Sequence, residues 1–154
     1  MKDIVIRKLS ERGVELVDIA AIVSELQKPY HPGLTPEVSL STVLAVLDKR
    51  EVQHTILVGI ALDTMAEQGF LEDPLCAIVS EDEPLFGVDE ILALGITNVY
   101  GTIGLTNFGY LDKVKPGILR LLNNHPTQVH TFLDDLVAGV AAAASARIAH
   151  NIFK

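Results

Sequence analysis

The sequence predicts an all-α protein, a compact bundle of about six or seven helices in which a central apolar helix is surrounded by the others. Aromatic residues make up only 5% of the 154 residues, and tryptophan is absent. Alanine and leucine, which are strong helix formers, dominate instead. Proline and glycine punctuate the chain at helix-sized intervals. The length suits a single domain, so we expect one helical domain over residues 1–154.

The first half of the chain is expected to hold five helices, in which apolar residues recur near the spacing of a helix face. These helices cover residues 2–10, 14–28, 36–48, 51–68 and 74–81. The third has the clearest start signal, because Thr35 is a good N-cap and Pro36 suits the first helical position. The acidic Glu37 then faces the positive end of the helix dipole.

The second half contains the two helices that we expect near the centre of the bundle. Residues 87–100 are almost wholly apolar, and a helix that is apolar all round belongs in the interior. Residues 101–109 are expected to form a bend or a distorted continuation, followed by a helix over 116–123. The last helix is expected over 127–150, and its alanine-rich run at 138–146 would let a neighbouring backbone approach closely.

Composition and charge exclude several classes of function. The net charge of −8, with no dense patch of Lys or Arg, argues against nucleic-acid binding and against attraction to anionic lipid. The single cysteine, Cys76, allows neither an internal disulfide nor a cysteine-based zinc site. The N-terminal residues show no signal-peptide pattern, so we expect a cytoplasmic location.

The chain is unusually apolar, with 49% hydrophobic residues and a mean hydropathy of +0.34. Its two most apolar stretches are 91–110 and 136–148. Neither supplies the roughly 20 consecutive apolar residues that a membrane span requires, so no transmembrane helix is expected. An apolar surface outside a membrane favours self-association, so we expect a homo-oligomer.

Carboxylates occur in unexpected places in the second half. Asp89 and Glu90 begin its most apolar segment, Asp134 and Asp135 lie early in the alanine-rich helix, and Asp112 follows an apolar stretch. Burying a carboxylate costs several kcal/mol unless it is paired or bound to a cation. Few positive side chains lie nearby. A divalent cation would satisfy these acids, and oxygen-only ligands favour Mg²⁺, Mn²⁺ or Ca²⁺ over zinc.

Three segments that carry these acids resemble the motifs of the phosphatidylglycerophosphatase A family, in the same order and at similar intervals. The segments are Gly87-Val88-Asp89-Glu90-Ile91, Phe108-Gly109-Tyr110-Leu111-Asp112-Lys113-Val114-Lys115-Pro116 and Leu133-Asp134-Asp135-Leu136-Val137-Ala138-Gly139. The chain as a whole is most similar to the soluble, YutG-like branch of the family. The resemblance implies an all-helical fold and an Mg²⁺-dependent hydrolysis of a phosphate monoester, either on a lipid such as phosphatidylglycerophosphate or on a related phosphate-bearing molecule. A lipid substrate would place the protein at the membrane periphery.

The resemblance also implies roles for individual residues. It makes Asp89, Glu90, Asp112, Asp134 and Asp135 the metal ligands. The catalytic candidates are Glu90 and Asp135 as the proton acceptor and Lys115 as a phosphate contact that stabilises transition-state charge. Gly139 would allow close helix packing beside the site.

The chain departs from the family pattern at positions that concern substrate recognition. Val88 and Gly117 replace tryptophans, and Gly109 replaces an arginine that would clamp a phosphate with two hydrogen bonds. Residues 127–130 replace a glycine-rich approach to the Asp-Asp pair. These differences keep a second interpretation open, a non-catalytic oligomerisation or regulatory module that retains the fold. A third, an Mg²⁺-dependent nucleotide pyrophosphohydrolase, lacks its usual paired Glu-x-x-Glu helices here.

Three further polar residues receive structural interpretations. We interpret His130 as the partner in a local hydrogen bond in preference to a proton shuttle. Asp63 and Glu67 lie four residues apart and repel each other unless something binds them. We expect them on a solvated helix face, with a peripheral metal contact as the second interpretation.

Overall fold

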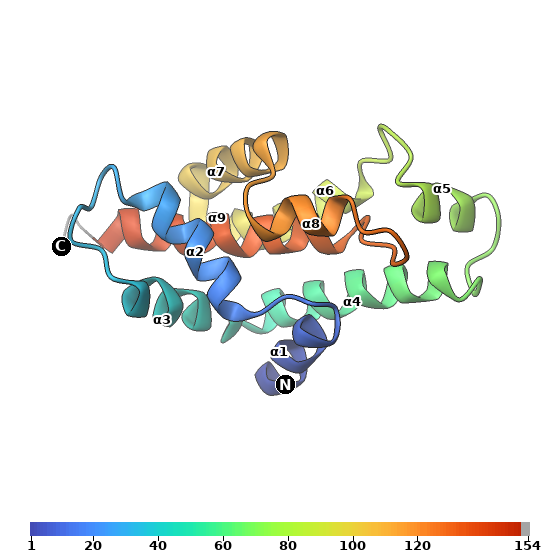
Figure 1. Ribbon diagram of the computed structural model, residues 1–154, viewed down its shortest axis with the longest axis horizontal. Coiled ribbons are helices and arrows are strands. Elements are labelled where there is room, and N and C mark those ends of the chain that lie inside the picture. The colour runs from blue at the N-terminus through green and yellow to red at the C-terminus, as the bar shows by residue number, and fades with distance from the viewer. Residues whose placement is uncertain (152–154) are drawn as a thin grey trace.

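The computed structural model describes residues 1–151, and within that range the chain is helical throughout and contains no β-strand (Figure 1). The nine α-helices and one 3-10 turn in these residues are α1 (Lys2–Glu11), α2 (Leu16–Gln27), α3 (Pro36–Leu47), α4 (Arg50–Glu67), α5 (Leu75–Glu81), α6 (Val88–Thr97), η1 (Asn98–Tyr100), α7 (Gly101–Val114), α8 (Ile118–Asn123) and α9 (Leu133–Asn151). The all-α class is confirmed. The number of helices exceeds the expectation partly because the predicted bend at 101–109 belongs to a helix, α7.

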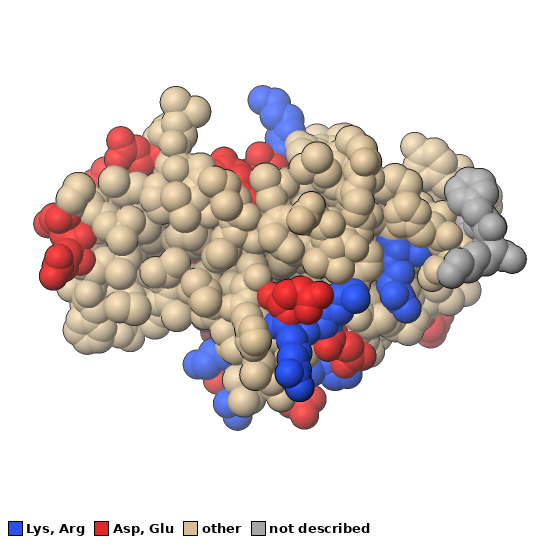
Figure 2. Space-filling model, turned by 180° about the vertical axis from the view of Figure 1, so that it is seen from behind, with Lys and Arg blue, Asp and Glu red and all other residues tan. Residues whose placement is uncertain are grey.

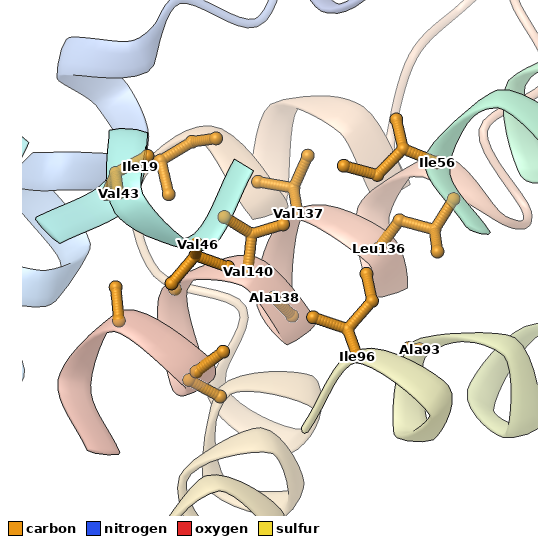
Figure 3. Packing of buried hydrophobic residues seen from close by; sticks show 14 of the residues in the cluster. Ile19, Val43, Val46, Ile56, Ala93, Ile96, Leu136, Val137, Ala138 and Val140 are labelled. Atoms are coloured by element: carbon orange, nitrogen blue, oxygen red, sulfur yellow. The ribbon is translucent and has the colours of Figure 1, made fainter. Parts of the chain in front are cut away.

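Of the two helices expected near the centre, the last one, α9, is the central apolar helix. It runs through the middle of the molecule, and α2, α3, α4, α6, α7 and α8 all pack against it (Figure 1). All its residues from Leu133 to Ala146 are buried. Figure 3 shows its apolar side chains meeting Ile19 of α2, Val43 and Val46 of α3, Ile56 of α4, and Ala93 and Ile96 of α6. Removal of this surface from water is the main stabilising term for the fold.

Two glycines let α9 lie unusually close to its neighbours. A Cβ atom on Gly139 would stand 3.2 Å from the carbonyl oxygen of Ala93 in α6. A Cβ atom on Gly59 of α4 would stand 2.3 Å from a methyl group of Leu136, a distance that real side chains do not adopt. The predicted role of Gly139 in close packing is therefore confirmed, and Gly59 has the same role on the α4 side.

The apolar stretch that begins at α6 folds back on itself. A straight helix would separate Asp89 from Asp112 by about 35 Å, yet both residues line one pocket. The reversal is made by η1 and by Gly101, whose φ of +72° interrupts the helical path. By length and composition Val88–Val114 could cross a membrane, with a mean hydropathy of 1.2 and 33% of that window buried. The reversal divides it into helices of 10 and 14 residues, each shorter than the ~20 residues of a span.

Two sequence-based expectations about these helices are wrong. Helix α6 is not interior on all sides, because Ile91 is 67% exposed and points away from α9. The segment covers α9 from one side, and its outer face has no protein against it among residues 1–151. The last helix begins at Leu133 and not near residue 127, because the side chains of Arg12, Asp63 and Glu67 hold residues 129–133 in place.

Candidate functional site

A pocket of about 230 Å³ lies where the N-terminal ends of α6 and α9 meet the C-terminal end of α7. The loop between α5 and α6 and one residue of α8 complete its wall. Six of the lining residues are those named from the sequence: Asp89, Glu90, Asp112, Lys115, Asp134 and Asp135. Residues that are up to 46 positions apart in the chain therefore share one site.

Helix geometry explains why acids can gather here. Asp89 and Glu90 lie in the first turn of α6, and Asp134 and Asp135 lie in the first turn of α9. The first turn of a helix exposes unpaired N–H groups and carries partial positive charge, which favours carboxylates. Two helix N-termini thus point their favourable ends toward the same acids, but partial charges of this size do not offset several full negative charges.

Asp89, Glu90 and Asp135 form the tightest cluster. One carboxylate oxygen from each lies within 4.8 Å of the others. Asp89 and Asp135 are buried, with exposed fractions of 7% and 3%. Oδ1 of Asp89 and Oε2 of Glu90 are buried and receive no hydrogen bond from the described residues. Buried carboxylate oxygens without a donor are costly, so either a cation or a proton held between Asp89 and Glu90 has to complete them.

Lys115 binds the other carboxylates of the site. Its Nζ lies 2.6 Å from Oδ2 of Asp134, 3.3 Å from Oδ1 of Asp112 and 3.8 Å from Oδ1 of Asp135. Lys115 ends α7 in the left-handed conformation, with φ at +46°, which turns the chain toward α8. Burial by itself would lower the pKa of Lys115, but the charges of Asp134, Asp135 and Asp112 outweigh it and raise that pKa. Lys115 is therefore a permanent cation in this site.

The raised pKa values of most of these acids reflect burial and the scarcity of positive charge around them. Burial, and then the charge of Asp134, raise the pKa of Asp135 to about 9. Burial also raises the pKa of Asp134 to about 6, although Lys115 acts against it. Burial and the adjacent Glu90 carboxylate raise the pKa of Asp89, whereas contact with Asp89 lowers the pKa of Glu90. Without a further cation, the site therefore retains protons near neutral pH.

The residues present fit a divalent cation. The pocket is lined by seven acidic residues and by Lys115 as its one basic residue. Ligands on opposite sides of Mg²⁺ or Ca²⁺ are about 4–5 Å apart, which matches the 4.8 Å within which Asp89, Glu90 and Asp135 oxygens lie. Two of the oxygens in this cluster have no donor. Asp134 is turned to Lys115 and accepts the N–H of Asp135 at 2.9 Å, so it lies at the edge of the cluster.

Six lining residues, those at 82–86 and Asn123, were not found from the sequence, and Asp82 and Asn123 illustrate why. Asp82, in the loop after α5, is an exposed residue at the pocket, and partial desolvation of its carboxylate raises its pKa. Asn123, at the end of α8, contributes an amide. Asp82 has acidic neighbours in the sequence, Glu81 and Glu83, and no pattern distinguishes it from them. Asn123 lies in no motif that would have marked it. Only the path of the loop brings Asp82 to the pocket.

The expectation for Asp63 and Glu67 is wrong, because both acids of α4 bind backbone near the start of α9. Asp63 is 0% exposed, and its two oxygens accept the N–H groups of Phe132 and Leu133 at 3.0 Å each. Glu67 accepts the N–H of Val129 at 2.7 Å. Asp63 thereby caps α9 at the turn that carries the Asp134–Asp135 pair.

Arg12, a residue of the first turn after α1, completes this clamp. Its guanidinium binds both oxygens of Glu67 and also donates to the carbonyl oxygen of Val129. The Arg–carboxylate contact is bidentate, which fixes orientation as well as charge. Together the three side chains hold residues 129–133 in a non-helical path, which is why α9 starts six residues later than predicted.

His130 has the structural role that the sequence favours. The ring is buried, and its Nδ1 lies 3.1 Å from the carbonyl oxygen of Leu122, while Nε2 lies 3.0 Å from Oε1 of Gln128. Both nitrogens are thus engaged within the segment that precedes α9. His130 does not line the acidic pocket.

Comparison with known proteins places this geometry in a family. Residues 18–150 match the family described as phosphatidylglycerophosphatase A. The uncharacterised protein YpjQ of Bacillus subtilis is 55% identical over 151 residues, which cover 98% of this chain and 85% of YpjQ. The uncharacterised protein YutG of the same organism is 56% identical over 145 residues, which cover 94% of this chain and 87% of YutG.

Solved structures agree with the fold. The crystal structure of YpjQ matches with a TM-score of 0.95 at 54% identity, covering 99% of this chain and 94% of that one. The crystal structure of the low temperature requirement C protein from Listeria monocytogenes matches with a TM-score of 0.97 at 56% identity. That match covers 99% of this chain and 97% of the Listeria chain. The arrangement of helices around α9 is therefore common to these proteins.

Proposed function

Because the chain belongs to the phosphatidylglycerophosphatase A family, we propose that it is an Mg²⁺-dependent phosphatase that hydrolyses a phosphate monoester. Membership of the family supports a phosphatase-like function. The observation that carries the proposal further is the buried cluster of Asp89, Glu90 and Asp135, in which two oxygens have no donor. Mn²⁺ or Ca²⁺ could substitute, because the same oxygen ligands accept them.

In this proposal the acids have distinct tasks. Asp89, Glu90 and Asp135 hold the metal, with Asp134 and Asp112 beside them as further ligands. Bound Mg²⁺ would supply charge neutralisation for the phosphate oxygens and a lowered pKa for the attacking water. Glu90 and Asp135 are the candidates to accept the proton of that water, and the lowered pKa of Glu90 keeps its carboxylate deprotonated and able to accept.

Lys115 is the proposed phosphate contact. Its Nζ already lies within 4 Å of three carboxylates, so it is positioned at the site without any rearrangement of the backbone. A phosphate group would compete with Asp134 and Asp112 for this ammonium group. Because the pKa of Lys115 is raised, its charge is available across the whole pH range of interest to stabilise the negative transition state.

The size of the pocket limits what enters it. Pockets that enclose a whole small molecule measure about 300–1,000 Å³, whereas this one measures about 230 Å³. The phosphate end of a substrate fits, and the remainder must stay outside. Leu85, on the pocket rim, is 101% exposed and adopts a φ of +68°. A fully exposed leucine beside a phosphate site supports a substrate with an apolar part, such as a lipid phosphate.

Phosphate release by the purified protein tests the proposal. The substrates would be phosphatidylglycerophosphate in detergent micelles and the soluble esters glycerol 3-phosphate and p-nitrophenyl phosphate, each with Mg²⁺ and with EDTA. We expect release that EDTA abolishes and that Asp89→Asn abolishes as well. Glu37→Gln is the matched control, because Glu37 is an exposed acid in the first turn of α3 and should leave the rate unchanged.

The alternatives predict different results. A non-catalytic module would release no phosphate from any of these esters, and Asp89→Asn and Asp134→Asn would leave Mg²⁺ affinity in calorimetric titration unchanged. A nucleotide pyrophosphohydrolase would release pyrophosphate from nucleoside triphosphates. Either outcome would overturn the proposal.

The contribution of Leu85 can be tested separately. If it contacts the apolar part of a lipid phosphate, Leu85→Ser should raise the KM for the micellar substrate and leave the rate with p-nitrophenyl phosphate unchanged. Equal effects on both substrates would contradict this role.

A further inference from the structure

The outward faces of α4 and α6 carry no charged side chain over most of their length. Residues 52–62 and 91–111 contain no Asp, Glu, Lys or Arg, in a chain whose net charge is −8. The next acid in α4, Asp63, is fully buried. Figure 2 shows the result from the side on which α6 covers α9, where a broad area without charged groups is bordered by charged groups at its edges. A surface of this kind is unusual for a charged protein and indicates an interface.

The exposed residues of these two helices follow the spacing of a helix-pairing seam. In α4, between the charged residues Arg50, Glu51 and Glu67 that are exposed at its two ends, they are His54, Val58, Ala61 and Met65. In α6 they are Val88, Ile91 and Gly95, and Asn98 of η1 continues the row. Steps of three and four residues place each set in one stripe along its helix. Val58 is 48% exposed, Met65 38% and Ile91 67%. Because α4 packs against α6, the two stripes belong to neighbouring helices, yet no helix among residues 1–151 covers them.

A hollow lies next to these stripes. It measures about 470 Å³ and is lined by residues of α6, η1 and α7: Leu94, Gly95, Thr97, Asn98, Gly101, Thr102 and Leu105. A Cβ atom added to Gly95 would meet nothing within 4 Å, so the glycine is not needed for packing inside the monomer. Small residues around a hollow on an uncharged face provide room for a side chain from a partner.

We propose that a second copy of this chain binds this face, so that α4 and α6 of each copy form a two-fold interface. Projecting side chains such as Ile91 lie on the same face as the hollow, and a two-fold axis brings the projection of one copy to the hollow of the other. Two chains that each carry a net charge of −8 repel one another. Contact through this face would bring no like charges together, because residues 52–62 and 91–111 carry none. An interface of ordinary size takes about 800 Å² from each partner, roughly a tenth of the 8169 Å² surface of this chain.

A membrane fits this face less well than a second copy does. The uncharged stretches contain neither Lys nor Arg to attract anionic lipid, and the chain contains no Trp to anchor at the lipid interface. His54, Asn98 and Thr102 place polar groups among the apolar ones, as in protein interfaces with an apolar core. A concave hollow also suits an inserted side chain better than a flat bilayer. The inference does not depend on the proposed function.

Sedimentation equilibrium of the full-length protein over a range of concentrations tests the proposal. We expect wild-type protein to form a dimer with a dissociation constant near or below about 1 µM. Val58→Glu and Gly95→Glu should each weaken the dimer by about a hundredfold or more, because each places a like charge in an apolar contact. Leu121→Glu is the matched control, since Leu121 is 66% exposed on α8, and it should leave the dimer intact.

Two further measurements keep the result interpretable. Circular dichroism should show that Gly95→Glu is folded, because a Cβ atom at this position meets nothing within 4 Å. A strictly monomeric wild type at about 100 µM, or a dimer that survives both substitutions in α4 and α6, would overturn the proposal. Co-sedimentation of the wild type with vesicles of phosphatidylcholine and phosphatidylglycerol that Val58→Glu abolishes would assign the face to a membrane instead.

Discussion

Two groups of acids in this molecule differ in what surrounds them. Asp63 and Glu67 on α4 receive backbone N–H groups from residues 129–133, and Glu67 also binds Arg12. Asp89 and Glu90 on α6, by contrast, each keep a buried oxygen with no donor among the described residues. Both groups lie near the start of α9, and both lie on helices, but only the second lacks partners.

The difference shows that burial of an acid does not by itself indicate a ligand site. A carboxylate whose oxygens are all hydrogen-bonded is complete and stabilises the segment that supplies the donors. A carboxylate with buried lone pairs and acidic neighbours is complete only when something positive binds. The α4 acids are therefore structural, and the α6 and α9 acids are the candidates for chemistry.

The largest expected effect is a loss of phosphatase activity when an acid of α6 or α9 is replaced, compared with replacement of an acid of α4. Asp89→Asn or Asp135→Asn should lower kcat/KM for phosphate release at least about a hundredfold, or about 2.7 kcal/mol, because each removes a proposed metal ligand. Glu67→Gln should change the rate far less. Steady-state phosphate release at saturating Mg²⁺ measures both. Equal losses in the two groups would mean that the α4 acids are as important for turnover as the α6 and α9 acids.

The next effect concerns stability. Asp63→Ala leaves the N–H groups of Phe132 and Leu133 without an acceptor in a buried site, and should lower the free energy of unfolding by about 2–3 kcal/mol. Urea unfolding measures this value. Thr55→Ala, on the exposed side of α4, is the control and should change stability by less than about 0.5 kcal/mol. A similarly small change for Asp63→Ala would show that it does not cap α9.

A pH series tests whether the acids of the site bind protons more tightly in the folded protein than in the unfolded protein. The pKa values of Asp134 and Asp135 in the folded protein are raised to about 6 and about 9 from 3.8. Folded protein therefore binds protons more tightly than unfolded protein, and its stability in EDTA should fall as pH rises from about 4 to about 9. We expect a decrease of about 1–3 kcal/mol across this range.

Added Mg²⁺ should reverse this trend, because the metal competes with the same protons. Thermal unfolding at pH 5.5 and pH 8 with EDTA or with Mg²⁺ measures the effect, and the increase in Tm that Mg²⁺ causes should be larger at pH 8. An increase that is equal at both pH values, or no increase, would argue against a metal at these acids. Ca²⁺ serves as a comparison for cation size.

The smallest effect has the opposite sign in the two groups. Without metal, Asp89→Asn removes a charge from a crowded acidic site and should stabilise the protein by about 1 kcal/mol at pH 8. Asp63→Asn should destabilise it under the same conditions, because an amide nitrogen would face an N–H group. Urea unfolding in EDTA provides both values, and destabilisation by Asp89→Asn would mean that its carboxylate is already satisfied.

The sequence predicted more of the site than of the connections that hold it. The acids of the three motifs could be named because each lies in an apolar context and because the motifs resemble those of a family. Asp63 could not, since two acids four residues apart look the same on a solvated face as in a buried clamp. The donors that distinguish these cases come from residues 69 and 70 positions further along the chain. Asp82 was missed because loop acids have no distinguishing pattern.

Two local features could be recognised from the order of residues. One is an alanine-rich helix whose small side chains suit the centre of the bundle, and the other is the placement of acids in the first turns of two apolar helices. Helix propensity and burial cost act on neighbouring residues, so they can be recognised in one dimension. The tertiary structure alone decided where α9 begins, that residues 88–114 fold back at Gly101, and which carboxylates lack a donor. These properties depend on which distant atoms meet, and the order of residues along the chain does not contain that information.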